Sequence, residues 1–152
     1  MPGIKPFLKY WLPVALWMAV IFSASTDALS SQRTSRIIGP FLRWLKPDIS
    51  AETVARVQYA VRKTAHVTEY ALLAALLWRA LRQPARKDPR PWNWREAFLA
   101  LGLAAAYSAS DEIHQAFVPT REGRWQDVVL DTFGAALGLL ALRAWFRWRK
   151  NS

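Results

Sequence analysis

The chain has 152 residues, no cysteine and a formal net charge of +10, with 53% hydrophobic and 21% charged residues. Without cysteine it has neither disulfides nor thiolate metal ligands. Its basic residues flank apolar blocks, a pattern that favours an anionic membrane surface and offers no soluble basic face to nucleic acid. We therefore expect one membrane domain over residues 1–152, a membrane lipid as partner, and no nucleic acid partner.

Four apolar segments are long enough to be membrane spans, which need about 20 residues. They cover about residues 7–24, 59–81, 96–117 and 127–148, and many of the nine Trp residues lie near their edges, as interface anchors do. The sequence therefore predicts an all-α fold, an integral membrane four-helix bundle. For the first segment a cleaved signal peptide is the alternative, because Ser23, Ala24 and Ser25 resemble a small-residue cleavage site.

The region between the first two spans, residues 25–58, is predicted to be a long connection. Apolar and basic residues alternate between Ile37 and Lys46, which suits a short helix that lies in the membrane interface. Pro40 and Pro47 are expected to limit its length. The sequence leaves two roles open for this segment, a lid and a simple linker.

The distribution of basic residues predicts the topology. A solvated basic loop at residues 79–95 and the C-terminal Arg147, Arg149 and Lys150 should lie on one cytoplasmic side, together with both termini. The polar ends of the second, third and fourth spans then meet at the outer leaflet, where we expect a polar pocket. Ionisable groups at membrane depth are costly and usually functional, so the site should lie there.

Helical periodicity sorts the residues of the second span into two faces. At about 100° per residue, a polar arc of about 120° should face protein. It contains Arg62, Lys63, His66, Glu69 and Tyr70. The opposite side contains Ala65, Thr68, Ala71 and Leu72.

The third and fourth spans also carry polar faces. On the third, one face contains Tyr107, Ser110, Asp111 and His114, with Gln115 at its edge. Glu112 lies off that face and is expected to point to solvent or to Arg121. On the fourth, a stripe contains Asp127, Asp131, Gly134 and Gly138. Its glycines form a GxxxG step, which lets another helix approach closely.

Two blocks of the sequence resemble the signature blocks of the VanZ-like family. They are KTAHVTEYALL (Lys63–Leu73) and SDEIHQAFVPTREGRWQDVVLDTFGAALG (Ser110–Gly138), with Thr120 standing where the family pattern has Gly. The resemblance implies a four-span, multi-pass protein of the bacterial inner membrane. It also implies a link to teicoplanin resistance, from which the family takes its name, and a relation to membrane enzymes that act on lipid head groups.

The first functional hypothesis is an enzyme that acts on a lipid-linked envelope component, with a phospholipid or polyprenyl-phosphate head group as the substrate. Imidazole suits general acid–base or nucleophilic roles, and carboxylates can orient it. The candidate catalytic residues are His66, Glu69, Asp111, His114, Asp127 and Asp131. The candidate substrate-binding residues are Arg62, Lys63, Glu112, Gln115, Arg121 and Arg124.

Other hypotheses stay open beside the enzyme. One is a divalent metal site, with His66, Glu69, Asp111 and His114 as ligands for Zn²⁺ or Mn²⁺. Another is a non-enzymatic polar network that fixes helix register, or that binds a glycopeptide, lipid or partner. A proton-coupled transporter fits less well, because the cytoplasmic halves of the spans are apolar. The sequence predicts no particular oligomeric state.

Overall fold

The computed structural model of the protein describes residues 4–26, 31–84, 88, 90–118 and 123–151 and contains helices but no strand over these ranges. The side chains of residues 4–6, 31–35, 150 and 151 are outside the description. The helices are α1 (Ile4–Ser25), α2 (Ser31–Leu45), α3 (Ala51–Arg82), α4 (Trp94–Ala116) and α5 (Trp125–Asn151). The predicted all-α class is confirmed.

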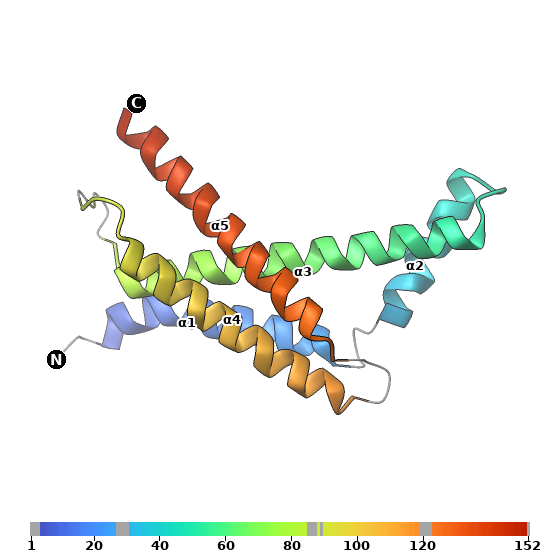
Figure 1. The fold of residues 1–152 in the computed structure, drawn as a ribbon, viewed down its shortest axis with the longest axis horizontal. Coiled ribbons are helices and arrows are strands. Elements are labelled where there is room, and N and C mark those ends of the chain that lie inside the picture. The colour runs from blue at the N-terminus through green and yellow to red at the C-terminus, as the bar shows by residue number, and fades with distance from the viewer. Residues whose placement is uncertain (1–3, 27–30, 85–87, 89, 119–122, 152) are drawn as a thin grey trace.

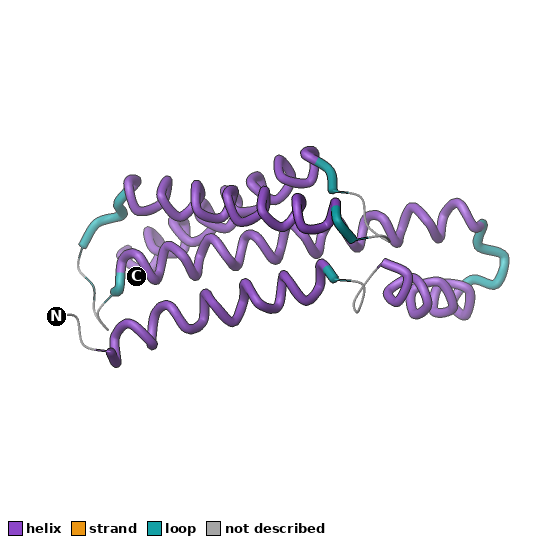
Figure 2. The backbone as a smooth tube through the Cα atoms, turned by 90° about the horizontal axis from the view of Figure 1, so that it is seen from below, coloured by secondary structure: helices purple, strands orange, loops and turns teal. Residues whose placement is uncertain are grey.

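Helix α3 is the centre of the arrangement. Of the described helices it alone contacts all the others, while α4 contacts α1, α3 and α5 (Figure 1). Its 32 residues span about 48 Å at a rise of about 1.5 Å per residue, which exceeds the hydrocarbon thickness of roughly 30 Å. The N-terminal part of α3 and helix α2 project beyond the other helices (Figures 1 and 2).

The helix that contains the second predicted span, about residues 59–81, begins earlier, at Ala51. The side chain of Ser50 caps it and accepts a hydrogen bond from the Thr53 amide (3.1 Å). Pro40 was expected to limit the interfacial helix, but α2 runs through it. Pro40 is exposed, so the carbonyl that its missing N–H leaves unbonded can be solvated. Pro47 does follow the end of α2.

The apolar core joins the helices through a mixture of large and small side chains. Helix α3 contributes Tyr70, Leu73, Leu77 and Trp78, and alanines on α4 and α5 allow close approach. The core also includes Tyr10, Val14 and Ile21 of α1, Ala97, Ala100 and Ala104 of α4, and Ala135 and Leu139 of α5. Helix α1 is therefore an integral part of the packed structure.

Two helices are long and apolar enough to cross a membrane, by length and composition: residues Phe7–Ser25 in α1 and Trp125–Arg149 in α5. Both expose large apolar side chains, such as Leu12 and Leu16 on α1 and Phe133 and Leu140 on α5. Contiguous exposed apolar surface of this kind indicates a membrane or interaction surface. Helices α3 and α4 carry more charged residues, so their role as spans stays a prediction.

Helices α3 and α5 meet at their backbones. A Cβ atom added at Gly134 would lie 2.6 Å from the Val67 carbonyl oxygen, and one added at Gly138 would lie 2.4 Å from that of Ala71. The close approach predicted from the GxxxG step is confirmed. The placement of Ala71 on the side of α3 away from protein was wrong, since its backbone forms part of this contact.

The loop between α3 and α4 is anchored by a buried arginine. The Arg82 guanidinium donates to Asp88 (Nε to Oδ2, 2.9 Å), to Glu96 (3.1 Å) and to the Arg90 carbonyl oxygen (2.7 Å). It also lies over the Trp78 ring, 5.3 Å from the centroid. The segment that was predicted to be a solvated basic loop therefore contains a buried, paired cation.

We expect Gly138→Ala to destabilise the protein by about 1–3 kcal/mol, because the new methyl group meets the α3 backbone, which cannot rotate away. Thermal unfolding in detergent, followed by circular dichroism, measures the effect. Gly102→Ala is the matched control, because a Cβ there has no neighbour within 4 Å and alanine favours the helix. Equal melting temperatures for the two variants would contradict the close contact.

The Asp88 carboxyl predicts a pH dependence of stability. Hydrogen bonds from the Arg90 side chain and, secondarily, from Arg82 hold the pKa of Asp88 well below its usual range. A lowered folded-state pKa stabilises the fold above the unfolded pKa of about 3.9, and this contribution is lost as the pH falls below it. We expect the melting-temperature difference between wild type and Asp88→Asn to be constant from pH 5 to 8. It should shrink below pH 4, and a difference that grows there would refute this account.

Candidate functional site

Buried polar side chains gather at one end of the helices, away from both chain termini. The N- and C-terminal ends of the chain lie at the opposite end in both views (Figures 1 and 2). The polar end is formed by the C-terminal halves of α1 and α4, the start of α5 and the middle of α3. Its buried members are Ser25, Ser108, Asp111, Glu112, Gln115 and Asp131.

The contact between α3 and α5 continues from the glycines into two ion pairs. Lys63 pairs with Asp127, and their side chains are 19% and 17% exposed. One turn further along, Nδ1 of His66 lies 3.3 Å from Oδ1 of Asp131. The two helices run in the same direction (Figure 1). Successive turns of α3 therefore meet successive turns of α5.

Asp131 joins three helices. It is fully buried, at 0% exposure. Its Oδ2 accepts a hydrogen bond of 2.7 Å from the Ser108 hydroxyl on α4, while Oδ1 faces His66 on α3. The carboxylate is thus held from one side and presents its other oxygen to the histidine.

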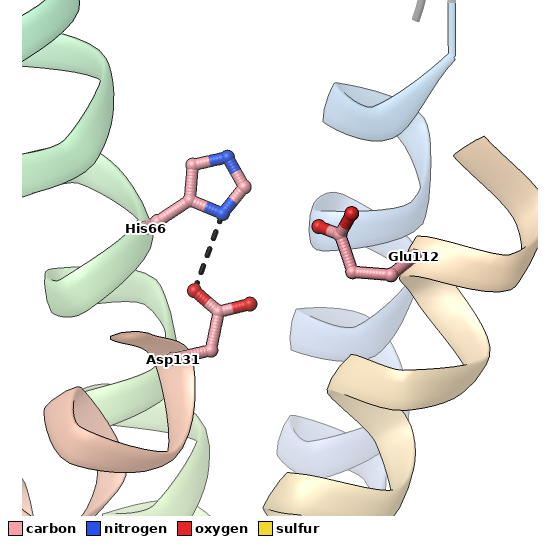
Figure 3. Close-up of side chains that lie close together, drawn as sticks. All are labelled: His66, Glu112 and Asp131. Atoms are coloured by element: carbon pink, nitrogen blue, oxygen red, sulfur yellow. Dashed lines mark ion pairs between the residues drawn. The ribbon is translucent and has the colours of Figure 1, made fainter. Parts of the chain in front are cut away.

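Glu112 completes a cluster with this pair. One side-chain atom each from His66, Glu112 and Asp131 lies within 4.8 Å of the others, and Figure 3 shows the three side chains converging from α3, α4 and α5. The expectation that Glu112 points to solvent was wrong, because Glu112 is only 5% exposed; the alternative partner, Arg121, lies outside the described residues. Helix α4 carries two polar faces, and the periodicity argument overlooked the one that contains Ser108 and Glu112.

The turn after α4 orients Glu112. The Arg124 amide donates to its Oε2 (2.8 Å), and Gln115 approaches its Oε1 at 3.4 Å. This arrangement requires Gly123, because a Cβ there would lie 2.3 Å from the Glu112 carbonyl oxygen. The chain can fold back against α4 only with a residue that lacks a side chain at this point.

The other polar face of α4 contacts α1. Oδ2 of Asp111 accepts hydrogen bonds from the hydroxyl of Ser25 (2.7 Å) and the amide of Gln115 (2.9 Å). The His114 ring lies 4.6 Å from the Phe22 ring, between centroids, and the Tyr107 hydroxyl donates to the Met18 carbonyl oxygen (2.6 Å). Within the described residues, the predicted metal ligands His66, Glu69, Asp111 and His114 therefore do not form one cluster.

The remaining predicted site residues lie around this centre. Glu69 is half-buried, and its backbone carbonyl accepts a hydrogen bond from the Trp17 indole (2.9 Å). Arg62 and Arg124 are exposed, and Arg121 lies outside the described residues. Ser25 and Ser108 were missed by the sequence argument. The spacing of Ser108, Glu112 and Gln115 on one helical face could have revealed Ser108, but no sequence signal singles out Ser25.

The charges at this end do not balance among the described residues. Four carboxyl groups, those of Asp111, Glu112, Asp127 and Asp131, lie near Lys63, the two imidazoles of His66 and His114, and Arg124, which is exposed and bonds Glu112 through its backbone amide. Lys63 compensates Asp127, and no described cation forms an ion pair with Glu112. Buried charges without partners are strongly unfavourable. The site is therefore suited to taking up a proton or a cation, and His66, Glu112 and Asp131 are the residues that could hold a metal.

Comparison with known proteins gives one match. A family model described as VanZ/LLP1 matches residues 10–147. No curated protein and no solved structure matches the chain. The matched region contains α2, α3 and α4 in full and most of α1 and α5.

We expect Lys63→Met to destabilise the protein by about 2–3 kcal/mol, because it leaves Asp127 largely enclosed without its cation. The double variant Lys63→Met/Asp127→Leu should recover most of that loss. Arg56→Met is the control, because its pair with Glu52 is 77% and 74% exposed and should contribute less than about 0.5 kcal/mol. A double variant no more stable than Lys63→Met would show that the two residues act independently.

Proposed function

Because the chain belongs to the VanZ/LLP1 family, we propose that it is a multi-pass protein of the bacterial inner membrane that acts on a phosphate-bearing lipid head group. The observation that carries the proposal is the cluster of His66, Glu112 and Asp131, with ligand-type atoms within 4.8 Å of one another. The substrate would be a phospholipid or a polyprenyl-phosphate-linked precursor of the cell envelope. A link to glycopeptide resistance is part of the proposal and rests on the family alone.

The proposed topology has α1, α3, α4 and α5 as spans and both termini in the cytoplasm. Its support is the concentration of basic residues near both termini, although α2, the turn after it and the start of α3, at the opposite end, also carry Arg36, Arg43, Lys46 and Arg56. Exposed Arg147 and Arg149 and the α3–α4 loop with Arg90 lie at the end near the termini, as positive-inside bias requires. The buried polar cluster lies at the other end, which would then face the head groups of the outer leaflet.

The proposed chemistry divides the work between the histidine and Glu112. Asp131 holds His66 through Nδ1, so the other ring nitrogen, Nε2, points away from Asp131 (Figure 3) and can donate a hydrogen bond to a phosphate oxygen. Asp131 stabilises positive charge on the imidazole. Glu112, with one oxygen held by the Arg124 amide, would accept the proton of a water that attacks the head-group phosphorus, and His66 Nε2 would give its proton to the oxygen that leaves as the P–O bond breaks. The 15% exposure of the His66 side chain leaves this centre open on one side.

A structural role is the second candidate function. Its support is that several polar groups satisfy one another across helices, as Ser108 does with Asp131 and Ser25 does with Asp111. Networks of this kind can specify helix register without chemistry. On this alternative, substitutions in the cluster would lower stability but leave membrane lipids unchanged.

We expect wild-type expression to change the head-group composition of one lipid class, and His66→Gln or Glu112→Gln to reduce that change by about 10²-fold or more. Mass spectrometry of total lipid extracts from matched cultures measures it. Ser110→Ala is the control, because Ser110 is exposed on the same helix and bonds only to the Tyr107 carbonyl in the described structure.

Membrane insertion of each variant is checked by the yield of folded, detergent-extracted protein. Folded His66→Gln and Glu112→Gln proteins that produce the wild-type lipid profile would refute the proposed chemistry. A lipid profile that wild-type expression does not alter would favour the structural role.

A further inference from the structure

We infer that His66, Glu112 and Asp131 form a binding site for one divalent cation of the Zn²⁺ class. Each residue offers one ligand atom, and these atoms lie within 4.8 Å of one another. They come from three different helices, α3, α4 and α5 (Figure 3). An imidazole and two carboxylates are common ligands of catalytic zinc, which takes three protein ligands and keeps a fourth position open.

The unsatisfied atoms at the centre of the cluster support this site independently. Oδ1 of Asp131 and Nδ1 of His66 are both enclosed, and among the described residues neither atom makes a hydrogen bond of good geometry. The two atoms face each other at 3.3 Å. Buried polar atoms are almost always satisfied in native proteins. A cation between them would satisfy both atoms together.

The contacts behind the ligands are those that a metal site needs. The second oxygen of Asp131 is held by the Ser108 hydroxyl at 2.7 Å, and one oxygen of Glu112 is held by the Arg124 amide at 2.8 Å. Such outer contacts fix the orientation of ligating groups. Each carboxylate is thereby anchored through one oxygen. The other oxygen of Glu112 accepts only a long hydrogen bond from Gln115 (3.4 Å), which leaves it a lone pair for an ion.

The ligand types select the ion. Mg²⁺ and Ca²⁺ favour sites made entirely of oxygen atoms, whereas imidazole favours Zn²⁺ and related transition ions. Zinc–ligand distances are about 2.0–2.2 Å, so ligand atoms around one ion lie within roughly 4 Å of one another. A cluster within 4.8 Å needs only a small contraction to reach this geometry. The partly exposed edge of His66 leaves room for the fourth ligand.

This inference rests on the proposed function only for what the ion would do. With an ion bound, His66, Asp131 and the second oxygen of Glu112 would be its ligands, so binding a phosphate oxygen and activating the attacking water would fall to the ion and not to Glu112. Binding of the ion is supported by the geometry of the three side chains alone. The ion would also supply the positive charge that the described cations leave missing around Glu112 and Asp131.

The test is metal binding by the full chain, purified in detergent with an affinity tag that contains no histidine. After chelator treatment and dialysis, Zn²⁺ is titrated in competition with a fluorescent chelator, and elemental analysis gives the stoichiometry. We expect one Zn²⁺ per chain. His66→Ala, Glu112→Gln and Asp131→Asn should each weaken binding by at least about tenfold.

Two matched controls and a second readout keep the test specific. Asp111→Asn removes a buried carboxylate, and His114→Ala removes an imidazole. Both residues lie on the same helix as the ligand Glu112, α4, but on its face toward α1. Both variants should bind Zn²⁺ like wild type. Zn²⁺ should raise the melting temperature of wild type and both controls, but not that of the ligand variants. If Asp131→Asn does not fold, the His66 and Glu112 variants decide the question.

The inference is overturned if the folded wild type binds no stoichiometric Zn²⁺, or if the ligand variants bind it as tightly as wild type. The lipid measurement separates this outcome from failure of the proposed function. If the head-group change persists with metal-free protein, the metal-site inference fails and the proposed lipid activity stands. If the protein binds Zn²⁺ tightly but causes no head-group change, the metal site stands and the proposed substrate is wrong.

Discussion

The structure depends on the backbone contact between α3 and α5. Gly134 and Gly138 bring α5 so close to Val67 and Ala71 that no side chain fits between the helices. Small residues at such a crossing let the two helix backbones approach closely. The same contact determines the site, because the next turns of the two helices hold Asp131 and His66 at 3.3 Å and pair Lys63 with Asp127.

Helix α4 connects this contact to the rest of the molecule through its two polar faces. Ser108 and Glu112 turn toward α3 and α5, whereas Asp111 and His114 turn toward α1. The polar end therefore contains two distinct groups of side chains, joined through Gln115, whose amide approaches both Asp111 and Glu112. The group centred on Asp131 brings an imidazole and a second carboxylate within 4.8 Å. The group centred on Asp111 has one carboxylate held by hydroxyl and amide partners, with the His114 ring against Phe22, which suits a packing role between α1 and α4.

The two ends of the molecule satisfy their buried charges differently. At the end near the termini, Arg82 is enclosed but fully bonded, to Asp88, Glu96 and a backbone carbonyl. At the other end, the described carboxyl groups outnumber the described cations. A shortage of partners among the described residues at only one end is a feature of that site. Functional sites are where such imbalance is usually found.

The sequence by itself determined the helical class, the apolar segments, the glycine step and the concentration of ionisable residues near Lys63–Glu69 and Asp111–Asp131, because these follow from local composition and helical periodicity. It could not decide which polar face of α4 meets which helix. That choice depends on the rotation of α4 about its axis, which is set by packing of Ala97, Ala100 and Ala104 and by the fold-back at Gly123. Only the tertiary structure therefore joined Glu112 to His66 and Asp131 and separated His114 from them. The reason is that periodicity gives the angles between side chains on one helix but not the direction in which that helix faces its neighbours.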